Sequence, residues 1–226
     1  MSEATQRPPA AASQDEPDRS APRQTRLVYF GDAMCSWCYG FAPQIERMRA
    51  ALADRAGFRL FAGGLRPYTR EPMDEGRRTQ IREHWEHVAQ ASGQPFDHAF
   101  FEREGFVYDT EPASRAVVTM RGRAPQRALD YMHAIQTAFY AENRDVTDES
   151  TLAEIATRFV ADREQFLQAL RSDAMKAAVR EDFAAAASAG VTGFPTLLLE
   201  TPRQTYLVTQ GYVKAEGLLP ALLEVI

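Results

Sequence analysis

The chain has 226 residues, of which 26 are Lys or Arg and 31 are Asp or Glu, so its formal net charge is −5 at neutral pH. This length suits one large domain, or one domain that carries an insertion, and it can bury a core without disulfide bonds. The acidic balance excludes the basic surface typical of nucleic-acid-binding proteins, and no stretch of about 18 apolar residues predicts a membrane span. We therefore expect neither nucleic acid nor a membrane as a partner.

Residues 1–24 alternate Pro, Ala, Ser and Gln with charged residues. A secretory signal needs a basic start followed by an apolar run of about 7–15 residues, and this stretch contains no such run. Its composition predicts a disordered tail and, with it, a cytoplasmic protein. In a reducing compartment we do not expect the two cysteines of the chain to form a permanent structural disulfide.

A strand–helix–strand unit follows the tail. Residues 26–31 are β-branched and aromatic and predict a buried strand, and residues 58–62 predict a second one. Between them, Phe41, Ile45 and Met48 recur at helical spacing on one face, and Gly57 ends that helix. Strands joined in this way should be parallel, with a right-handed crossover.

Residues 75–190 show helical periodicity almost throughout, with candidate caps at Asp148 and Asp162. Strand character returns at residues 196–200 and 205–208, which predict a hairpin with a loop of five to six residues, and a short amphipathic helix closes the chain. We therefore predict an α/β protein whose two ends share one mixed sheet, with a large all-helical insertion between them.

The only two cysteines, Cys35 and Cys38, flank Ser36 and Trp37 directly after the first predicted strand. If Cys35 caps the following helix, Cys38 lies in its first turn, close enough for a disulfide to open and close. The unpaired N–H groups of the helix start favour a thiolate at Cys35. The helix dipole contributes only about 0.3–1 kcal/mol, so direct hydrogen bonds must also contribute. We expect the Cys35 sulfur to lie uncovered at the helix tip.

Three other interpretations of the cysteine pair remain open. A structural zinc site would need two histidines besides the two cysteines. A structural disulfide would close a very short loop, where the stabilisation is smallest. The pair can also be two inert core thiols. A C-x-x-C motif between a strand and a helix favours redox chemistry over these alternatives. The histidines available to a zinc site are His84, His87, His98 and His133.

The stretch GVTGFPT, residues 190–196, precedes the third predicted strand. Because only about 5–6% of X–Pro bonds in folded proteins are cis, these residues alone predict a plain turn at Phe194-Pro195.

The combination resembles the DsbA-like disulfide oxidoreductases of the thioredoxin superfamily, over about residues 25–226. The motifs that carry the resemblance are Cys35-Ser36-Trp37-Cys38, Pro43 and Gly193-Phe194-Pro195-Thr196. MCSWCYGF looks most like the cytoplasmic branch that includes FrnE-type proteins. The resemblance implies a thioredoxin-like domain at residues 25–70 and 190–226 and an inserted helical domain at residues 71–189.

The resemblance also implies roles for single residues. Cys35 would attack and form a mixed disulfide, and Cys38 would resolve it. Pro195 would be a cis-proline facing the cysteines, and Phe194 would offer backbone groups to an extended substrate segment, beside Ser36 and Trp37. Asp32, just before the motif, would either assist proton transfer to Cys38 or act as a solvated helix cap. Partners would be thiol-containing proteins or small thiols, without a metal or bound cofactor, and with glutathione as a candidate redox partner.

Two further functions remain open beside a thiol–disulfide oxidoreductase. Kappa-class glutathione transferases and hydroxychromene carboxylate isomerases share this layout, which implies a glutathione-dependent isomerase or transferase, although a serine stands in them where Cys35 stands here. Some relatives with the layout act as adaptors for proteolysis, which implies a redox-inactive interaction protein. Unlike some FrnE-type proteins, this chain has no second cysteine pair near residue 226.

Overall fold

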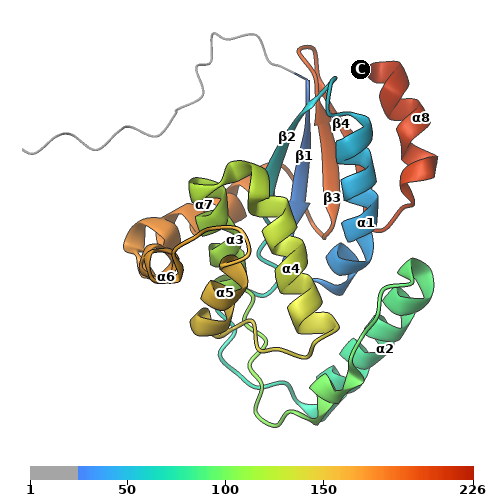
Figure 1. Ribbon diagram of the computed structural model, residues 1–226. Helices are drawn as coiled ribbons and strands as arrows, with labels where there is room; N and C mark the ends of the chain where they lie inside the picture. The colour runs from blue at the N-terminus through green and yellow to red at the C-terminus, as the bar shows by residue number, and fades with distance from the viewer. Residues whose placement is uncertain (1–24) are drawn as a thin grey trace, which may run out of the picture.

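The computed structural model describes residues 25–226, so the tail predicted for residues 1–24 lies outside the described residues. The described part is built on a four-stranded sheet in the order β2-β1-β3-β4 (Figure 1). β1 pairs parallel with β2 and antiparallel with β3, and β3 pairs antiparallel with β4. The mixed sheet predicted from the sequence is confirmed. Its strands are β1 (Arg26–Gly31), β2 (Gly57–Ala62), β3 (Thr196–Glu200) and β4 (Thr205–Gln210).

The β3–β4 hairpin differs from the prediction in its loop. Only residues 201–204 connect the strands, which is shorter than the five to six residues expected. The predicted strand bounds are met at Glu200 and Thr205, so only the expected loop length is wrong, and within the loop the Thr201 N–H donates to the Gln204 carbonyl at 2.9 Å. β4 also extends to Gln210, two residues beyond the predicted end.

Helix α1 (Ser36–Ala51) connects β1 to β2 and lies beside α8 (Ala215–Val225) on one face of the sheet (Figure 1). Leu27 and Tyr29 of β1 belong to the main core with α1 residues, whereas Val28 and Phe30 pack on the opposite face with Ala186. Because both faces of β1 are covered, its residues from Leu27 to Phe30 are all apolar rather than alternating with polar ones.

The predicted helical block lies between β2 and β3, as expected. Asp148 and Asp162 cap their helices by accepting hydrogen bonds from the N–H groups of Thr151 and Gln165, at 2.8 and 2.9 Å. Its helices are α2 (Glu75–Ser92), α3 (Glu111–Arg123), α4 (Ala128–Tyr140), α5 (Glu149–Ala156), α6 (Arg163–Arg171) and α7 (Asp173–Ser188), with short 3-10 turns η1 (His98–Glu102) and η2 (Pro125–Arg127).

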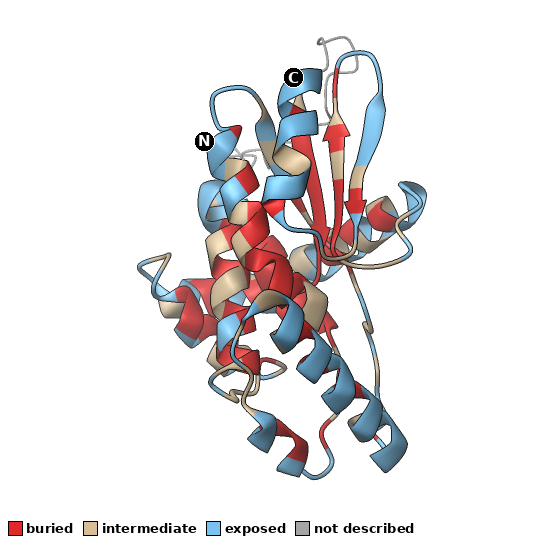
Figure 2. Cartoon of the chain, turned by 90° about the vertical axis from the view of Figure 1, so that its right-hand side faces the viewer, coloured by how far each residue is buried: buried red, intermediate tan, exposed pale blue. Residues whose placement is uncertain are grey.

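One continuous hydrophobic core joins the sheet to the helical block. Figure 2 shows the buried residues gathered where the helices meet the sheet, with exposed residues along the outer helices. Whether residues 71–189 form a separate domain stays a prediction. Among residues 25–226, no helix combines the length and apolar character that a membrane span requires.

An ion pair with a buried carboxylate ties the helical block to the edge strand β2. Asp182 of α7 accepts hydrogen bonds from the Ala62 N–H at 2.8 Å and from both Nη atoms of Arg121 of α3, at 2.7 and 2.8 Å. Arg121 also donates to the Leu60 carbonyl at 2.7 Å. Backbone groups on the outer side of an edge strand have no neighbouring strand, so these two side chains satisfy them. We call this set the Arg121–Asp182 joint.

Candidate active site

Both cysteines lie at the N-terminus of α1, directly after β1. Cys35 is the N-cap residue in extended conformation, with no side-chain cap, and Cys38 is the third residue of the helix. Both are free thiols. The structure therefore places the pair as the sequence predicted, at a helix start whose first N–H groups lack helical partners.

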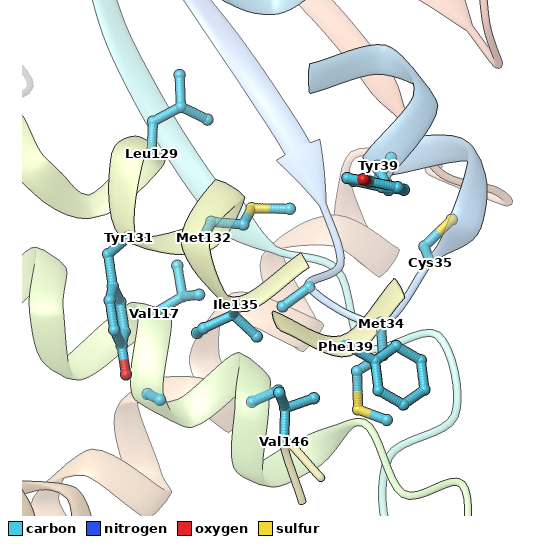
Figure 3. Packing of buried hydrophobic residues seen from close by; sticks show 14 of the residues in the cluster. Met34, Cys35, Tyr39, Val117, Leu129, Tyr131, Met132, Ile135, Phe139 and Val146 are labelled. Carbon is cyan, nitrogen blue, oxygen red and sulfur yellow. The ribbon is translucent and has the colours of Figure 1, made fainter. Parts of the chain in front are cut away.

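The expectation that the Cys35 sulfur lies uncovered is wrong. Cys35 is only 5% exposed and Cys38 is fully buried. Cys35 packs in the main hydrophobic core, and its thiol donates a hydrogen bond to the Phe194 carbonyl with an Sγ–O distance of 3.6 Å. Figure 3 shows Cys35 and Met34 at the edge of a cluster whose other labelled members include α4 residues. Of the two cysteines, Cys35 alone keeps a small exposed fraction.

The loop before β3 closes over Cys35. The Phe194-Pro195 bond is cis, as the resemblance implies and contrary to the plain turn expected from the residues alone. Pro195 is buried and Phe194 is half-buried. The Phe194 ring lies on the backbone of Gly63, where an added Cβ would come within 2.4 Å of a ring carbon. Gly63 therefore leaves room for the Phe194 ring in its observed position.

Asp32 is neither a solvated residue nor the cap of α1. It is fully buried, and its carboxylate accepts hydrogen bonds from the N–H groups of Met34 at 2.8 Å and Leu65 at 2.7 Å. Burial raises the pKa of Asp32, and these backbone donors partly oppose the shift. The carboxylate thus holds the turn before Cys35 against the chain that follows β2.

Side chains of the helical block hold the same turn from the other side. Tyr108 donates to the Met34 carbonyl at 2.8 Å, and its hydroxyl lies 3.3 Å from that of Tyr140. Gln136 of α4 donates to the Asp32 carbonyl at 3.4 Å. Sequence reasoning missed these residues, because they lie far along the chain and no local pattern links them to the turn.

Cys38 is fully buried in the main hydrophobic core. Its sulfur accepts a hydrogen bond from the Asp32 N–H at 3.4 Å. Burial raises the pKa of Cys38 well above its ordinary value, and the neighbouring Cys35 raises it further. Tyr29 was also missed from the sequence. Its pKa is raised well above the ordinary value, first by burial and then by the nearby Cys38.

A shallow, mainly apolar cavity of about 320 Å³ opens beside the cysteine pair. It is lined by Trp37, Phe194 and Tyr212, together with Ala91 and Gly211. The Trp37 and Tyr212 rings lie 5.9 Å apart, and Tyr212 donates to the Ala91 carbonyl at 3.2 Å. We call this cavity the Trp37 groove. Ser36, between Cys35 and Trp37, is half-buried.

The zinc alternative finds little support in the described residues. Within residues 25–226, no group of three or more His, Cys, Asp or Glu side chains is placed to hold a metal ion. His84, His87 and His98 are exposed, and His133 faces Glu46 with an Nδ1–Oε1 distance of 3.4 Å.

Comparison with protein families and solved structures identifies proteins that are similar to this chain. The family model of DSBA-like thioredoxin domains matches residues 26–211. A crystal structure from Nitrosomonas europaea, of a protein described as a candidate protein disulfide isomerase, is 35% identical, with a TM-score of 0.83 over 90% of this chain and 99% of that one. The cytosolic disulfide reductase DsbM from Pseudomonas aeruginosa is 24% identical, with a TM-score of 0.71 over 89% of this chain and 100% of DsbM. DsbM has also been solved with GSH.

A curated relative carries a different description. The chain is 24% identical over 179 residues to the ClpXP adapter protein SpxH of Bacillus subtilis (strain 168). The match covers 78% of this chain and 58% of SpxH, so the chain spans less than two thirds of that relative.

Proposed function

Because the chain belongs to the family of DsbA-like thioredoxin domains, we propose that it is a thiol–disulfide oxidoreductase in which Cys35 is the nucleophile and Cys38 the resolving thiol. One observation carries this proposal. Cys35 caps α1 beside the Phe194 carbonyl and keeps a small exposed fraction, while Cys38 is sealed one turn further along. The Cys35 sulfur therefore reacts with the substrate, and the Cys38 sulfur reacts only with that of Cys35.

The proposed reaction proceeds in two exchanges. The Cys35 thiolate attacks a substrate disulfide, forming a mixed disulfide and releasing one substrate thiolate, which takes up a proton. Cys38 then attacks the Cys35 sulfur, the Cys35–Cys38 disulfide forms, and the second substrate sulfur leaves as a thiol. Two protein thiols are oxidised and one substrate disulfide is reduced. The same steps run backwards when the protein oxidises a dithiol.

For the substrate we propose an extended segment with an apolar side chain near its cysteine. Once the Cys35 sulfur is ionised or bonded, it no longer donates to the Phe194 carbonyl, which becomes free to pair with the substrate backbone. The Trp37 groove lies next to this carbonyl and takes the apolar side chain. Ser36, Trp37, Phe194 and Pro195 thus form the proposed substrate-binding surface.

The test is reduction of insulin by dithiothreitol, followed by turbidity. The wild type accelerates the reaction, Cys35→Ser abolishes the acceleration, and Cys38→Ser accumulates a mixed disulfide that mass spectrometry detects. A Cys35→Ser variant as active as the wild type would refute the assignment.

Glutathione is the small thiol that we propose as redox partner. The support is the likeness to DsbM, which has been solved with GSH. The cytosolic origin stated for DsbM also supports our prediction of a cytoplasmic protein. Calorimetry with oxidised and reduced glutathione tests the first point, and a glutathione-dependent isomerase activity would require binding at millimolar concentration.

A second candidate function is favoured by the match to the ClpXP adapter SpxH. In this case the chain binds a protein partner and the thiols regulate or do not affect the binding. Pull-down from a lysate with the wild type and with a Cys35→Ser/Cys38→Ser double variant separates the two. The same partner held equally by both proteins, together with no insulin reduction, would favour an adaptor.

A further inference from the structure

Tyr29 has a buried hydroxyl group that lacks a partner. The side chain is fully buried in the main core, and its hydroxyl makes no hydrogen bond within the described residues. Native proteins satisfy nearly all their buried polar groups, and an exception at a functional site points to a catalytic or redox role. A phenylalanine would fill the same space without the unmet donor, so the hydroxyl calls for an explanation.

The contacts of the Tyr29 ring bring it close to Cys38. Tyr29 points from β1 toward α1, where its ring centroid lies 6.1 Å from that of Phe41. Phe41 follows Cys38 by three residues on the helix, so the two share one face. The far end of the Tyr29 ring passes over Gly31, where an added Cβ would lie 2.8 Å from two ring carbons. The next N–H group, that of Asp32, is the one that donates to the Cys38 sulfur.

We propose that the Tyr29 hydroxyl donates a hydrogen bond to the Cys38 sulfur whenever that sulfur carries negative charge. Tyr29 and the Asp32 N–H then form a pair of donors for the Cys38 thiolate. This inference rests on the proposed function, because only thiol–disulfide exchange places charge on Cys38.

The charge arises in both directions of the exchange. When Cys38 resolves a mixed disulfide, it attacks as a thiolate, and its proton ends on the departing substrate thiol. When a substrate thiolate attacks the Cys35 end of the protein disulfide, Cys38 leaves as the thiolate and later takes up a proton. In each case the bond between Cys35 and Cys38 forms or breaks with negative charge on Cys38.

Tyr29 acts as a donor and not as a base. Burial and the neighbouring Cys38 raise its pKa well above the ordinary value, so the hydroxyl stays protonated near neutral pH. While Cys38 is a protonated thiol, the hydroxyl gains little from it. The bond is therefore strongest when the sulfur is charged, which is the condition for lowering an exchange barrier.

The test uses the reduced full-length protein and the chromogenic disulfide of 5-thio-2-nitrobenzoate. Cys35 attack releases one equivalent of the yellow thiolate in a phase proportional to reagent concentration, and Cys38 resolution releases the second in a phase independent of it. We expect Tyr29→Phe to leave the first phase unchanged and to slow the second by about tenfold or more, the effect of one hydrogen bond to a charged group.

The matched control is Tyr131→Phe. Tyr131 is also fully buried, but its hydroxyl donates to the Leu152 carbonyl at 2.8 Å within the helical block. This variant should lose stability in urea and keep the rates of both phases, whereas Tyr29→Phe should keep or gain stability and slow the second phase. A Tyr29→Phe variant with an unchanged second phase would overturn the inference.

A second measurement keeps the inference testable if resolution is too fast to follow. In a Cys35→Ser background, the ultraviolet absorbance of the Cys38 thiolate is titrated with pH. Tyr29→Phe should move this titration to higher pH, and an unmoved titration would contradict the inference. If instead Cys38→Ser releases both equivalents as the wild type does, the proposed function itself fails, and not only the role of Tyr29.

Discussion

Two buried aspartates lie in two regions of the molecule and differ in their partners. Asp182 is 3% exposed and meets both Nη atoms of Arg121 as well as the Ala62 N–H. Asp32 is 0% exposed, and among the described residues no cationic side chain pairs with it. Its carboxylate meets backbone N–H groups, and burial raises its pKa. The Arg121–Asp182 joint is thus fully paired, and the cysteine site is not.

This difference indicates that one region stabilises the fold and that the other serves the thiol chemistry. A buried charge with full compensation holds elements together, and removing one partner is costly. Around Cys38, Asp32 has no cationic partner and the Tyr29 hydroxyl has no hydrogen-bond partner among the described residues, so both groups are sensitive to the charge on the Cys38 sulfur. We therefore expect changes in the joint to lower stability and spare the thiol chemistry. Changes around the cysteine pair should impair the thiol chemistry and spare the stability.

The largest effect on stability is expected from Arg121→Met. It leaves the Asp182 carboxylate buried without its cation, and the loss should be about 2–3 kcal/mol. This is below the full cost of breaking a buried pair, because the Arg121 side chain is itself 29% exposed. Urea denaturation measures the loss. The control is Arg123→Met, whose exposed guanidinium reaches only Gln165 and should matter by less than about 0.5 kcal/mol. An Arg121→Met variant that keeps its stability but loses thiol exchange would break the comparison.

Gly63→Ala should affect both stability and thiol exchange, because the Phe194 ring packs against Gly63. The added methyl group cannot fit against this ring without moving it, at a cost of about 1–3 kcal/mol. Because Phe194 also lines the Trp37 groove, moving its ring should slow insulin reduction as well. Gly122→Ala in α3 is the matched control, since open space surrounds it and the change should stabilise the helix by about 0.5–1 kcal/mol. Equal behaviour of the two variants would show that Phe194 is not held by Gly63.

Asp32→Asn should change how stability depends on pH. Because the native pKa of Asp32 is raised above 3.8, the native state binds more protons than the unfolded state between these two values. The contribution of Asp32 to the free energy of unfolding is therefore complete at low pH and is lost as the pH rises through the native pKa. Asparagine does not titrate, so the variant should gain on the wild type across this window, by about 1.4 kcal/mol for each pH unit that separates the native pKa from the unfolded one.

Urea denaturation at several pH values between 4 and 8 measures this difference. A constant offset reflects the altered hydrogen bonds of the amide and does not bear on the prediction. The exposed Asp54 supplies the control, and Asp54→Asn should run parallel to the wild type. Parallel curves for Asp32→Asn and the wild type would contradict a raised native pKa.

The smallest effect is expected from Trp37→Ala. Removing one wall of the Trp37 groove should raise the KM for insulin by about three- to tenfold and leave the reaction with 5-thio-2-nitrobenzoate disulfide unchanged. Tyr206→Ala, an exposed aromatic residue on β4 outside the groove, should change neither. Equal losses with both substrates would place Trp37 in the chemistry rather than in substrate binding.

Much of the fold could be predicted from the sequence, because local patterns encode it. Residues 26–31, with apolar side chains from Leu27 to Phe30, predict a buried strand, and β1 is covered on both faces. Asp148 and Asp162 stand three residues before the N–H groups that they cap. The spacing of Cys35 and Cys38 after a strand predicts a helix start, which the structure has there. Each of these signals lies within a short stretch of neighbouring residues.

The surroundings of the cysteine pair could not be predicted in the same way. The contacts of Tyr108 with Met34 and of Gln136 with Asp32 join residues 74 and 104 positions apart, so no local period carries them. The covering of Cys35 depends on Phe194, which lies 159 positions further along the chain. The motif thus predicts where the sulfurs stand on the helix, whereas their exposure is decided by distant segments that pack against them.

The most direct test of the central claim is an equilibrium titration of the reduced protein in glutathione buffers of increasing oxidation, with acid quenching, alkylation and mass spectrometry. We predict a single two-electron transition in which Cys35 and Cys38 lose their alkylation sites together and form one intramolecular disulfide, and which vanishes in Cys35→Ser. Two thiols that stay alkylatable up to fully oxidised glutathione would contradict the account.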